Sequence, residues 1–190
     1  MALRTGYAIP MGKATNADRD DMSESFGGQV PLFIEIGGKP HPNFFVGGYL
    51  GIGFGPAAGA VKSFCDDGGI TCTEIGVRLG AEFQYHILPE AMANPWIGYG
   101  IGYESTGIAM SAGGQTGNFT ATGLEFAHFM AGVDFRLNRV LGIGPVVDFS
   151  LGQYSRVRTE FPGSAARDLE IADKAMHEWL ALGVRVVFFP

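Results

Sequence analysis

The clearest pattern in the chain is an alternation of apolar residues with polar or small residues over positions 74–87. The odd positions are apolar throughout, and the even positions carry glutamate, arginine, glutamine, histidine or glycine. A period of two is typical of a β-strand with one apolar face. At about 3.3 Å per residue the strand would be about 45 Å long, well above the usual strand of about 5–6 residues. A long strand with a wholly apolar face suits a lipid bilayer.

The same alternation predicts seven further strands, which makes eight in all. In the sixth of these eight strands, the pattern puts Ala127 and Phe129 on the apolar face, opposite His128 and Asp134. The seven segments cover residues 3–9, 29–36, 46–55, 96–104, 127–136, 141–152 and 180–188.

One stretch, residues 43–61, carries no charge and is long enough for a transmembrane helix. It contains Pro56 and several glycines. In a helix the proline would cost about 3 kcal/mol and each glycine about 1 kcal/mol. Read with a period of two, the stretch has one apolar face and one face lined by glycine. The sequence therefore favours a strand here.

The connections between the strands alternate in length. The short ones cover residues 38–43, 88–95 and 138–139, and the mostly longer, polar ones cover 11–28, 56–73, 111–118 and 155–176. Short turns at one end and long loops at the other are typical of outer-membrane barrels. The charged residues share a face with the glycines and the opposite face is bulky and uncharged, whereas a soluble barrel would have the reverse arrangement. The sequence predicts an all-β fold, an eight-stranded antiparallel up-and-down transmembrane β-barrel, as a single domain over residues 1–190.

Composition agrees with this prediction. Charged residues make up 17% of the chain, against about 25% in ordinary soluble domains. The net charge of -6 argues against a nucleic-acid partner, which usually requires a basic face. Two cysteines are too few for a disulfide scaffold or a four-thiolate zinc site. We expect no metal and no cofactor.

This pattern resembles the small eight-stranded outer-membrane barrels of the OmpA, OmpX and OmpW kind, over nearly the whole chain. Like them, the chain has aromatic residues at the end of its last strand, Phe188 and Phe189, although the terminal Pro190 departs from that pattern. Three segments also resemble uncharacterised outer-membrane barrels of myxobacteria; they cover residues 125–127, 151–155 and 177–180.

The resemblance implies the outer membrane of a Gram-negative bacterium, with the long loops outside the cell. It implies contact with outer-membrane lipid and lipopolysaccharide, and with the barrel-assembly machinery during biogenesis. The alternating pattern begins directly after Met1, so we expect that an export signal has been removed. The loop partner is left open.

The predicted lumen carries charges of both signs. An eight-stranded barrel is only just wide enough for its own side chains, and a buried charge without a partner is strongly unfavourable. We therefore expect the charges to pair and to plug the lumen, with Arg78 and Glu82 in one network with Asp134, Arg136 or Arg185. The candidate residues of this lumen charge network are Arg4, Glu35, Arg78, Glu82, Glu104, Asp134, Arg136, Asp148 and Arg185.

Cys65 and Cys72 flank an Asp-Asp-Gly-Gly segment in the second long loop. Such a segment favours a tight turn that can bring the two thiols together. Because the surface outside the outer membrane is oxidising, we expect a disulfide between them. In the last long loop, residues 164–176 can form a short helix, although an isolated helix of that length is marginal in water.

Four histidines raise the possibility of catalysis, because some small outer-membrane barrels are lipid-modifying enzymes. His177 and Glu178, at the base of a loop, are the first pair to consider. However, the sequence near the histidines contains no serine nucleophile grouped with a histidine base. The acidic run over residues 18–21 with Glu24 lacks EF-hand spacing and fits a solvated loop better than a calcium site.

The function favoured by the sequence is non-enzymatic: a structural or surface-recognition barrel that acts through its long loops, with a lumen plugged by charge pairs. One alternative is a narrow channel for small or hydrophobic solutes. A second alternative is a lipid-active outer-membrane enzyme.

Overall fold

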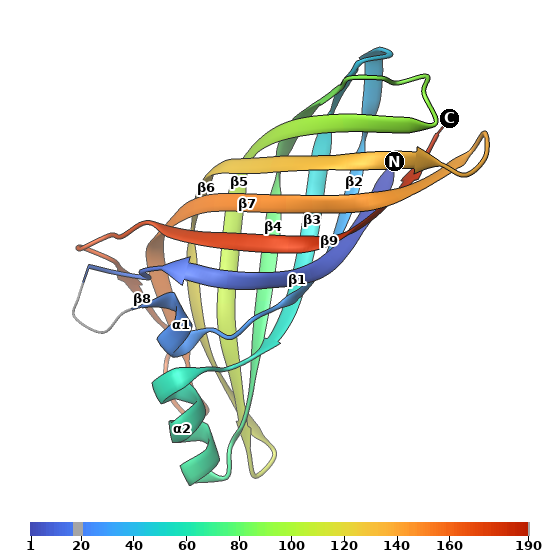
Figure 1. Ribbon diagram of the computed structural model, residues 1–190. Coiled ribbons are helices and arrows are strands. Elements are labelled where there is room, and N and C mark those ends of the chain that lie inside the picture. The colour runs from blue at the N-terminus through green and yellow to red at the C-terminus, as the bar shows by residue number, and fades with distance from the viewer. Residues whose placement is uncertain (17–20, 190) are drawn as a thin grey trace.

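The computed structural model describes residues 1–16 and 21–189 and shows a closed β-barrel (Figure 1). Strands β1 to β7 and β9 form a ring of eight in which every neighbouring pair is antiparallel. The ring closes where β1 pairs with β9, over residues 2–12 and 177–187. The predicted fold class is confirmed.

The barrel strands are longer than the predicted segments, mainly towards one end. Their bounds are β1 Ala2–Gly12, β2 Val30–His41, β3 Phe44–Pro56, β4 Thr71–His86, β5 Ala93–Ala112, β6 Gln115–Arg136, β7 Leu141–Glu160 and β9 His177–Phe188. Outside the ring lie α1 Met22–Ser25, α2 Gly59–Gly68 and β8 Arg167–Glu170.

The two ends of the barrel differ, as the connection lengths predict. The short-turn end holds three connections, over residues 42–43, 87–92 and 137–140, and both chain termini lie there (Figure 1). The long-loop end holds α1, α2 and β8.

The outer surface of the ring is apolar. Leu79, Ile97 and Leu182 are 55–64% exposed although they are large and apolar, a state that is costly in water and favourable in lipid. Their strand neighbours point inward because successive side chains in a strand alternate between faces. The apolar faces predicted from the sequence are therefore the outer faces.

The connection predicted at residues 111–118 is instead a tight hairpin. Gly113 and Gly114 both have positive φ, 56° and 80°, which is the requirement of a two-residue turn of type I′ and is met readily by glycine. The turn allows β5 and β6 to pair up to Ala112 and Gln115. This hairpin extends from the long-loop end (Figure 1).

The last long connection also differs from the expectation. Residues 167–170 form β8, which pairs with β7 over residues 156–159, and not a helix. Pairing with β7 provides hydrogen-bond partners for the backbone of this short segment. An isolated helix would have to satisfy its backbone groups within its own few residues. In the described part of the chain, no helix has the length and apolar character needed to cross a membrane.

A bulge in β6 changes which residues point inward. The register with β7 shifts between Glu125 and Ala127, and Ala127 and His128 are both buried although they are consecutive. Ala127 nevertheless faces outward, as predicted, because it pairs with Leu151, whose neighbours Ser150 and Gly152 are the buried residues of β7. Phe126, which is 36% exposed, is the extra residue of the bulge on this outer face. A bulge adds one residue to one strand, which moves every residue on one side of it to the opposite face.

Candidate functional site in the barrel lumen

The inward faces of the eight strands bring the polar side chains into the lumen. Towards the short-turn end, Arg185 of β9 is 2% exposed. Its Nη2 donates to Glu35 Oε2 at 2.8 Å, and its Nη1 donates to Asp134 Oδ2 at 2.7 Å. Gln84 Oε1 accepts from the same Nη2 at 2.8 Å. Arg185 also lies over the ring of Trp96, 4.3 Å from its centroid.

Arg4 of β1 continues this cluster towards the middle of the barrel. It forms ion pairs with Glu35 and with Asp148 of β7, and its guanidinium lies 4.6 Å from the ring centroid of Phe33. Asp148 has a further partner, His128 Nε2, at 3.2 Å. Arginine can hold two carboxylates at once because its planar guanidinium has five donors.

Arg78 of β4 forms a second cluster, nearer the long-loop end. Its Nη1 lies 3.5 Å from Glu125 Oε1, and its Nε lies 3.8 Å from Glu104 Oε2. Each carboxylate has another partner, since Tyr49 donates to Glu125 and His177 bonds to Glu104. The two clusters together extend along the lumen.

Two predicted members of the network have no ion-pair partner among the described residues, although Glu82 lies within electrostatic range of Arg4 and Arg185. Glu82 is 3% exposed, but it forms no ion pair among the residues that the structure describes. Arg136 lies at the short-turn end, where Nη2 donates to the carbonyl oxygen of Pro89 at 3.1 Å and the guanidinium lies over the ring of Phe189. Arg136 is the last residue of β6, so its side chain lies at the rim and does not pair with the buried carboxylates.

Glycines make room for the large inward side chains. A Cβ on Gly80 or Gly102 would lie far inside van der Waals contact with the hydroxyl oxygen of Tyr49. Tyr49 needs this space to cross the lumen and donate to Glu125 on β6. The glycines that share a face with the charged residues therefore leave space for a long inward side chain.

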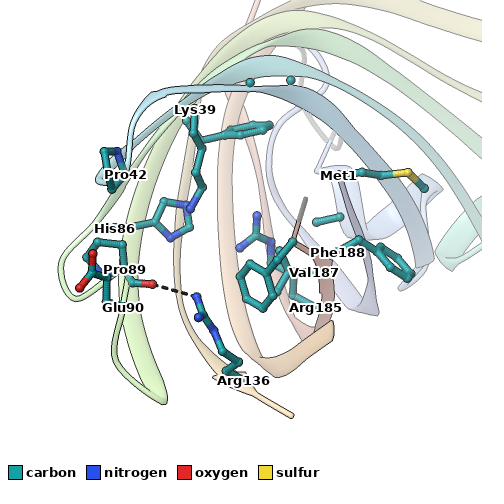
Figure 2. A pocket seen from close by; sticks show the side chains of 15 residues that line it. Met1, Lys39, Pro42, His86, Pro89, Glu90, Arg136, Arg185, Val187 and Phe188 are labelled. Atoms are coloured by element: carbon teal, nitrogen blue, oxygen red, sulfur yellow. Dashed lines mark hydrogen bonds between the residues drawn. The ribbon is translucent and has the colours of Figure 1, made fainter. Parts of the chain in front are cut away.

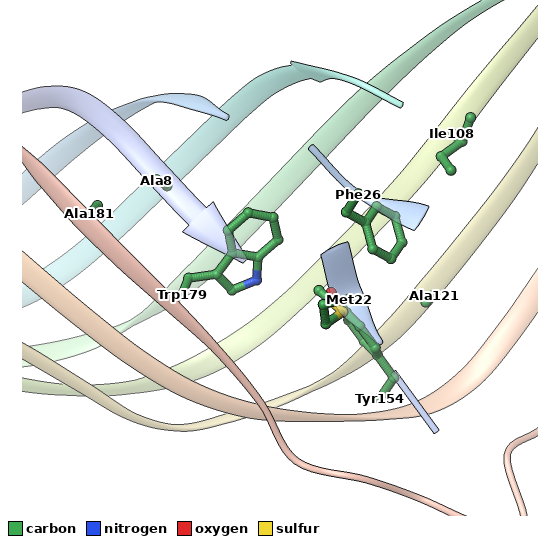
Figure 3. Packing of buried hydrophobic residues seen from close by; sticks show 8 residues of the cluster. All are labelled: Ala8, Met22, Phe26, Ile108, Ala121, Tyr154, Trp179 and Ala181. Atoms are coloured by element: carbon green, nitrogen blue, oxygen red, sulfur yellow. The ribbon is translucent and has the colours of Figure 1, made fainter. Parts of the chain in front are cut away.

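At the long-loop end, an apolar cluster covers the ion pairs of the lumen. Met22 of α1 and Phe26, which follows it, are 0% and 2% exposed, and they pack with Tyr154 and Trp179 of the barrel wall (Figure 3). Because α1 belongs to the connection between β1 and β2, this connection folds back into the barrel mouth.

Three of the four histidines, His86, His128 and His177, are buried inside the barrel, and His41 is exposed at the end of β2. His177 stacks on Tyr154, with 4.0 Å between ring centroids, and bonds to Glu104. Its sequence neighbour Glu178 points to the other side, because adjacent residues of a strand alternate. The pair suggested by the sequence is therefore separated. Asp18 and Asp20 of the acidic run lie outside the described residues.

The predicted disulfide between Cys65 and Cys72 is present, with 6.1 Å between the Cα atoms. The turn predicted between the cysteines is different, since Cys65 lies in α2 and Cys72 in β4. Gly69 ends α2 in the left-handed conformation, with φ 62°, which is a common end of a helix. The disulfide ties this helix to the barrel wall.

The cavities differ sharply along the barrel. Two cavities between the middle portions of the strands have volumes of about 20 and 10 Å³ and border Arg4, Arg78, His128 and Asp148. Cavities of this size hold about one or two water molecules. A cavity of about 580 Å³ lies at the short-turn end (Figure 2).

Comparison with known proteins agrees with this geometry at the level of the fold. No protein-family model and no curated protein sequence matches the chain. A major outer membrane protein from Thermus thermophilus is similar in structure, with a TM-score of 0.54, 13% identity and coverage of 100% of both chains. This is the fold of the small outer-membrane β-barrels. Neisserial surface protein A is also similar, with a TM-score of 0.53, 12% identity and coverage of 98% of this chain and 96% of that one. Both neighbours are barrels of the bacterial outer membrane. This is the location that the sequence predicts for the present barrel.

Proposed function

We propose that this protein is a non-enzymatic integral barrel of the outer membrane whose lumen is closed and whose role is carried by the long-loop end. The observation that carries the proposal is the filling of the lumen by paired side chains. Arg4 and Arg185 connect three buried carboxylates, Glu35, Asp134 and Asp148, across the barrel from β1, β2, β6, β7 and β9.

The closure has two layers. Ion pairs occupy the middle of the lumen, where the cavities are about 10 and 20 Å³, and the apolar cluster with Met22 and Phe26 covers the long-loop mouth. A solute would have to separate buried ion pairs and also move α1. Either step is costly, since a buried charge that loses its partner is strongly unfavourable. This favours a closed barrel over a narrow channel.

The groups that could perform chemistry are held by one another. His177 bonds to Glu104, His128 bonds to Asp148, and the hydroxyl of Ser150 accepts from Arg78. Catalysis by a serine requires its hydroxyl to bond to a base. Ser150 is the cross-strand partner of His128, but its hydroxyl bonds to Arg78 while His128 Nε2 bonds to Asp148. This arrangement favours a structural role for these side chains over a lipid-active enzyme.

The exposed structures at the long-loop end are ordered by backbone pairing and by the disulfide. They present apolar side chains, Phe64 of α2, Phe161 after β7 and Leu169 of β8, that are 49–61% exposed. In outer-membrane barrels the longer loops face outside the cell. We assign this end to the cell surface, with the apolar outer wall in contact with lipid and lipopolysaccharide and with the barrel-assembly machinery acting before insertion.

The orientation is tested by labelling intact cells with an amine reagent that does not cross membranes. Lys62 of α2 has a side chain that is 61% exposed, and Lys39 is exposed at the short-turn end. Mass spectrometry should find the label on Lys62 in intact cells and on Lys39 only after the membrane is opened. Labelling of Lys39 alone in intact cells would reverse the orientation and contradict the proposal.

The other two function classes are tested with the purified protein in lipid vesicles. Vesicles that contain the barrel should retain entrapped small sugars as well as empty vesicles do. Phospholipid and lipopolysaccharide incubated with the barrel should be recovered unchanged. Rapid sugar release would support the channel, and cleaved or transferred acyl chains would support the enzyme.

A further inference from the structure

The cavity at the short-turn end is built differently from the rest of the lumen. Its volume is about 580 Å³, within the range of about 300–1,000 Å³ that is typical of small-molecule sites. Residues from β2, β6, β9 and the connection between β4 and β5 line it (Figure 2). At its inner wall lies Arg185, whose charge is already paired with Glu35 and Asp134.

His86 at the end of β4 supplies a buried donor without an acceptor. It is 1% exposed, and its Nε2 has no hydrogen-bond partner among the described residues. The backbone N–H of Leu88 donates to Asn94 Oδ1, at 3.3 Å, so the amide nitrogen of Asn94 faces His86 Nδ1, at 2.8 Å. Nδ1 therefore accepts, and the proton of the neutral ring lies on Nε2. The ring of His86 borders the cavity.

Two cations lie on the same side of the cavity. The ammonium group of Lys39 ends beside the ring of His86 (Figure 2). Arg136 uses one N–H group for the carbonyl oxygen of Pro89, while its Nε is buried and has no partner in the described part of the chain. Neither cation forms an ion pair with a carboxylate in that part of the chain. Glu90 is the one acidic residue in the described lining, and it is exposed.

The remaining walls are apolar. Phe45 of β3, Val187 of β9 and Phe189 line the cavity, and Phe189 is held in place by the guanidinium of Arg136 over its ring. A group of donors on one side and an apolar surface on the other is the usual arrangement of a specific small-molecule site. His86, Lys39 and Arg136 can each donate, and none of them has a free acceptor, so the complementary ligand group is an anion with several acceptors.

We propose that this cavity binds a small organic monoanion. Its carboxylate or similar anionic group would accept from His86, Lys39 and Arg136, and its apolar body would lie against Phe45, Val187 and Phe189. The site is separate from the lumen charge network, and the closed lumen above it means that the ligand enters from the short-turn end. In an outer-membrane barrel that end faces the periplasm.

The site is tested by calorimetric titration of the full-length barrel in lipid nanodiscs with 4-phenylbutyrate, which combines one carboxylate with an apolar ring. The barrel should bind it saturably at one site. The neutral analogue 4-phenylbutanamide and inorganic phosphate should each bind at least roughly tenfold more weakly, because one lacks the charge and the other lacks the apolar body.

Variants separate this site from general attraction of anions to the barrel. Lys39→Ala and Arg136→Ala should each weaken binding by roughly five- to tenfold, as expected for the loss of one charge-assisted contact. Arg139→Ala is the matched control, since it removes a positive charge from a turn at the same end but does not line the cavity. It should leave the affinity unchanged. His86→Phe should weaken binding while keeping a ring of similar shape in the wall.

A second measurement guards against misfolding. Each variant should keep the shift in electrophoretic mobility on heating that marks a folded barrel. The ¹H resonance on Nε2 of His86 should move when 4-phenylbutyrate binds and should not move with the amide. The proposal is overturned if the wild-type barrel shows no saturable binding, if the amide binds equally well, or if Arg139→Ala weakens binding as much as the cavity variants.

Discussion

Replacement of Arg185 by alanine is the perturbation for which the structure gives the most definite expectation. Arg185 is 2% exposed and donates to Glu35, Asp134 and Gln84 at 2.7–2.8 Å. Without it, Glu35 retains Arg4, but Asp134 retains only the indole N–H of Trp96, at 3.2 Å. Among the residues that the structure describes, one buried carboxylate is then left without an ion-pair partner.

The free energy of unfolding should therefore fall by about 3–5 kcal/mol, the usual result of removing one partner of a buried ion pair. Equilibrium unfolding in urea of the barrel in lipid vesicles measures this change, with tryptophan fluorescence as the signal. Val184→Ala is a suitable control, because Val184 is the neighbour of Arg185 in β9, faces outward and is 45% exposed. The Val184→Ala substitution should lower the free energy of unfolding much less than Arg185→Ala does.

A double variant distinguishes the unpaired charge from the lost packing. If the cost arises from the unpaired carboxylate of Asp134, then Asp134→Asn should recover about 1–3 kcal/mol in the Arg185→Ala background. A loss below about 1 kcal/mol for Arg185→Ala, or no recovery in the double variant, would refute the reasoning that these charges depend on each other.

Three further results are expected. Arg78→Ala should cost less than Arg185→Ala, about 2–3 kcal/mol by urea unfolding, because the carboxylates near Arg78 keep other hydrogen-bond partners; an equal or larger loss would contradict this ranking. Leu79→Arg, on the outer wall where Leu79 is 61% exposed, should cost about 2–4 kcal/mol in the same assay if the residue lies near the bilayer midplane, and a neutral effect would argue against lipid at that surface. A thiol assay on the denatured, unreduced protein should find no free thiol, and reduction of Cys65–Cys72 should increase hydrogen exchange in α2 while the barrel stays folded; two reactive thiols per chain would show that the disulfide is absent in solution.

The sequence is sufficient to predict the outer wall of the barrel, since a strand with a period of two has only two faces. The bulky apolar positions of β4, such as Leu79 and Phe83, are exposed on the outside, and Glu82 and Gln84 are buried inside. The sequence does not contain the register between strands that are far apart in the chain. The contacts of Arg185 with Glu35 and Asp134 depend on how β9, β2 and β6 lie across the lumen, which only the closed ring determines.

Glu125 shows why some lumen residues escape sequence reasoning. The alternation in residues 127–136 puts even positions inside, so Glu125 would be assigned outward by that phase. The bulge before His128 reverses the phase, and Glu125 is fully buried beside Arg78 and Tyr49. A carboxylate in a predicted lipid-facing position is the one signal that could have revealed the bulge, because such a residue is costly there.

The structures at the long-loop end are the other part that the sequence does not predict. Gly113 and Gly114 could be recognised as a type I′ turn, since a Gly-Gly pair is favourable there. By contrast, α1 is too short to be stable alone, and it forms because Met22 is buried against the barrel mouth. Its position depends on tertiary packing and not on local sequence.

The central claim, a lumen closed by paired charges and covered by an apolar cluster, is tested most directly by single-channel recording in a planar lipid bilayer. The account predicts that the intact, heat-modifiable barrel inserts without steady openings of nanosiemens size. Large and steady openings from the intact protein would contradict the account and would support a channel.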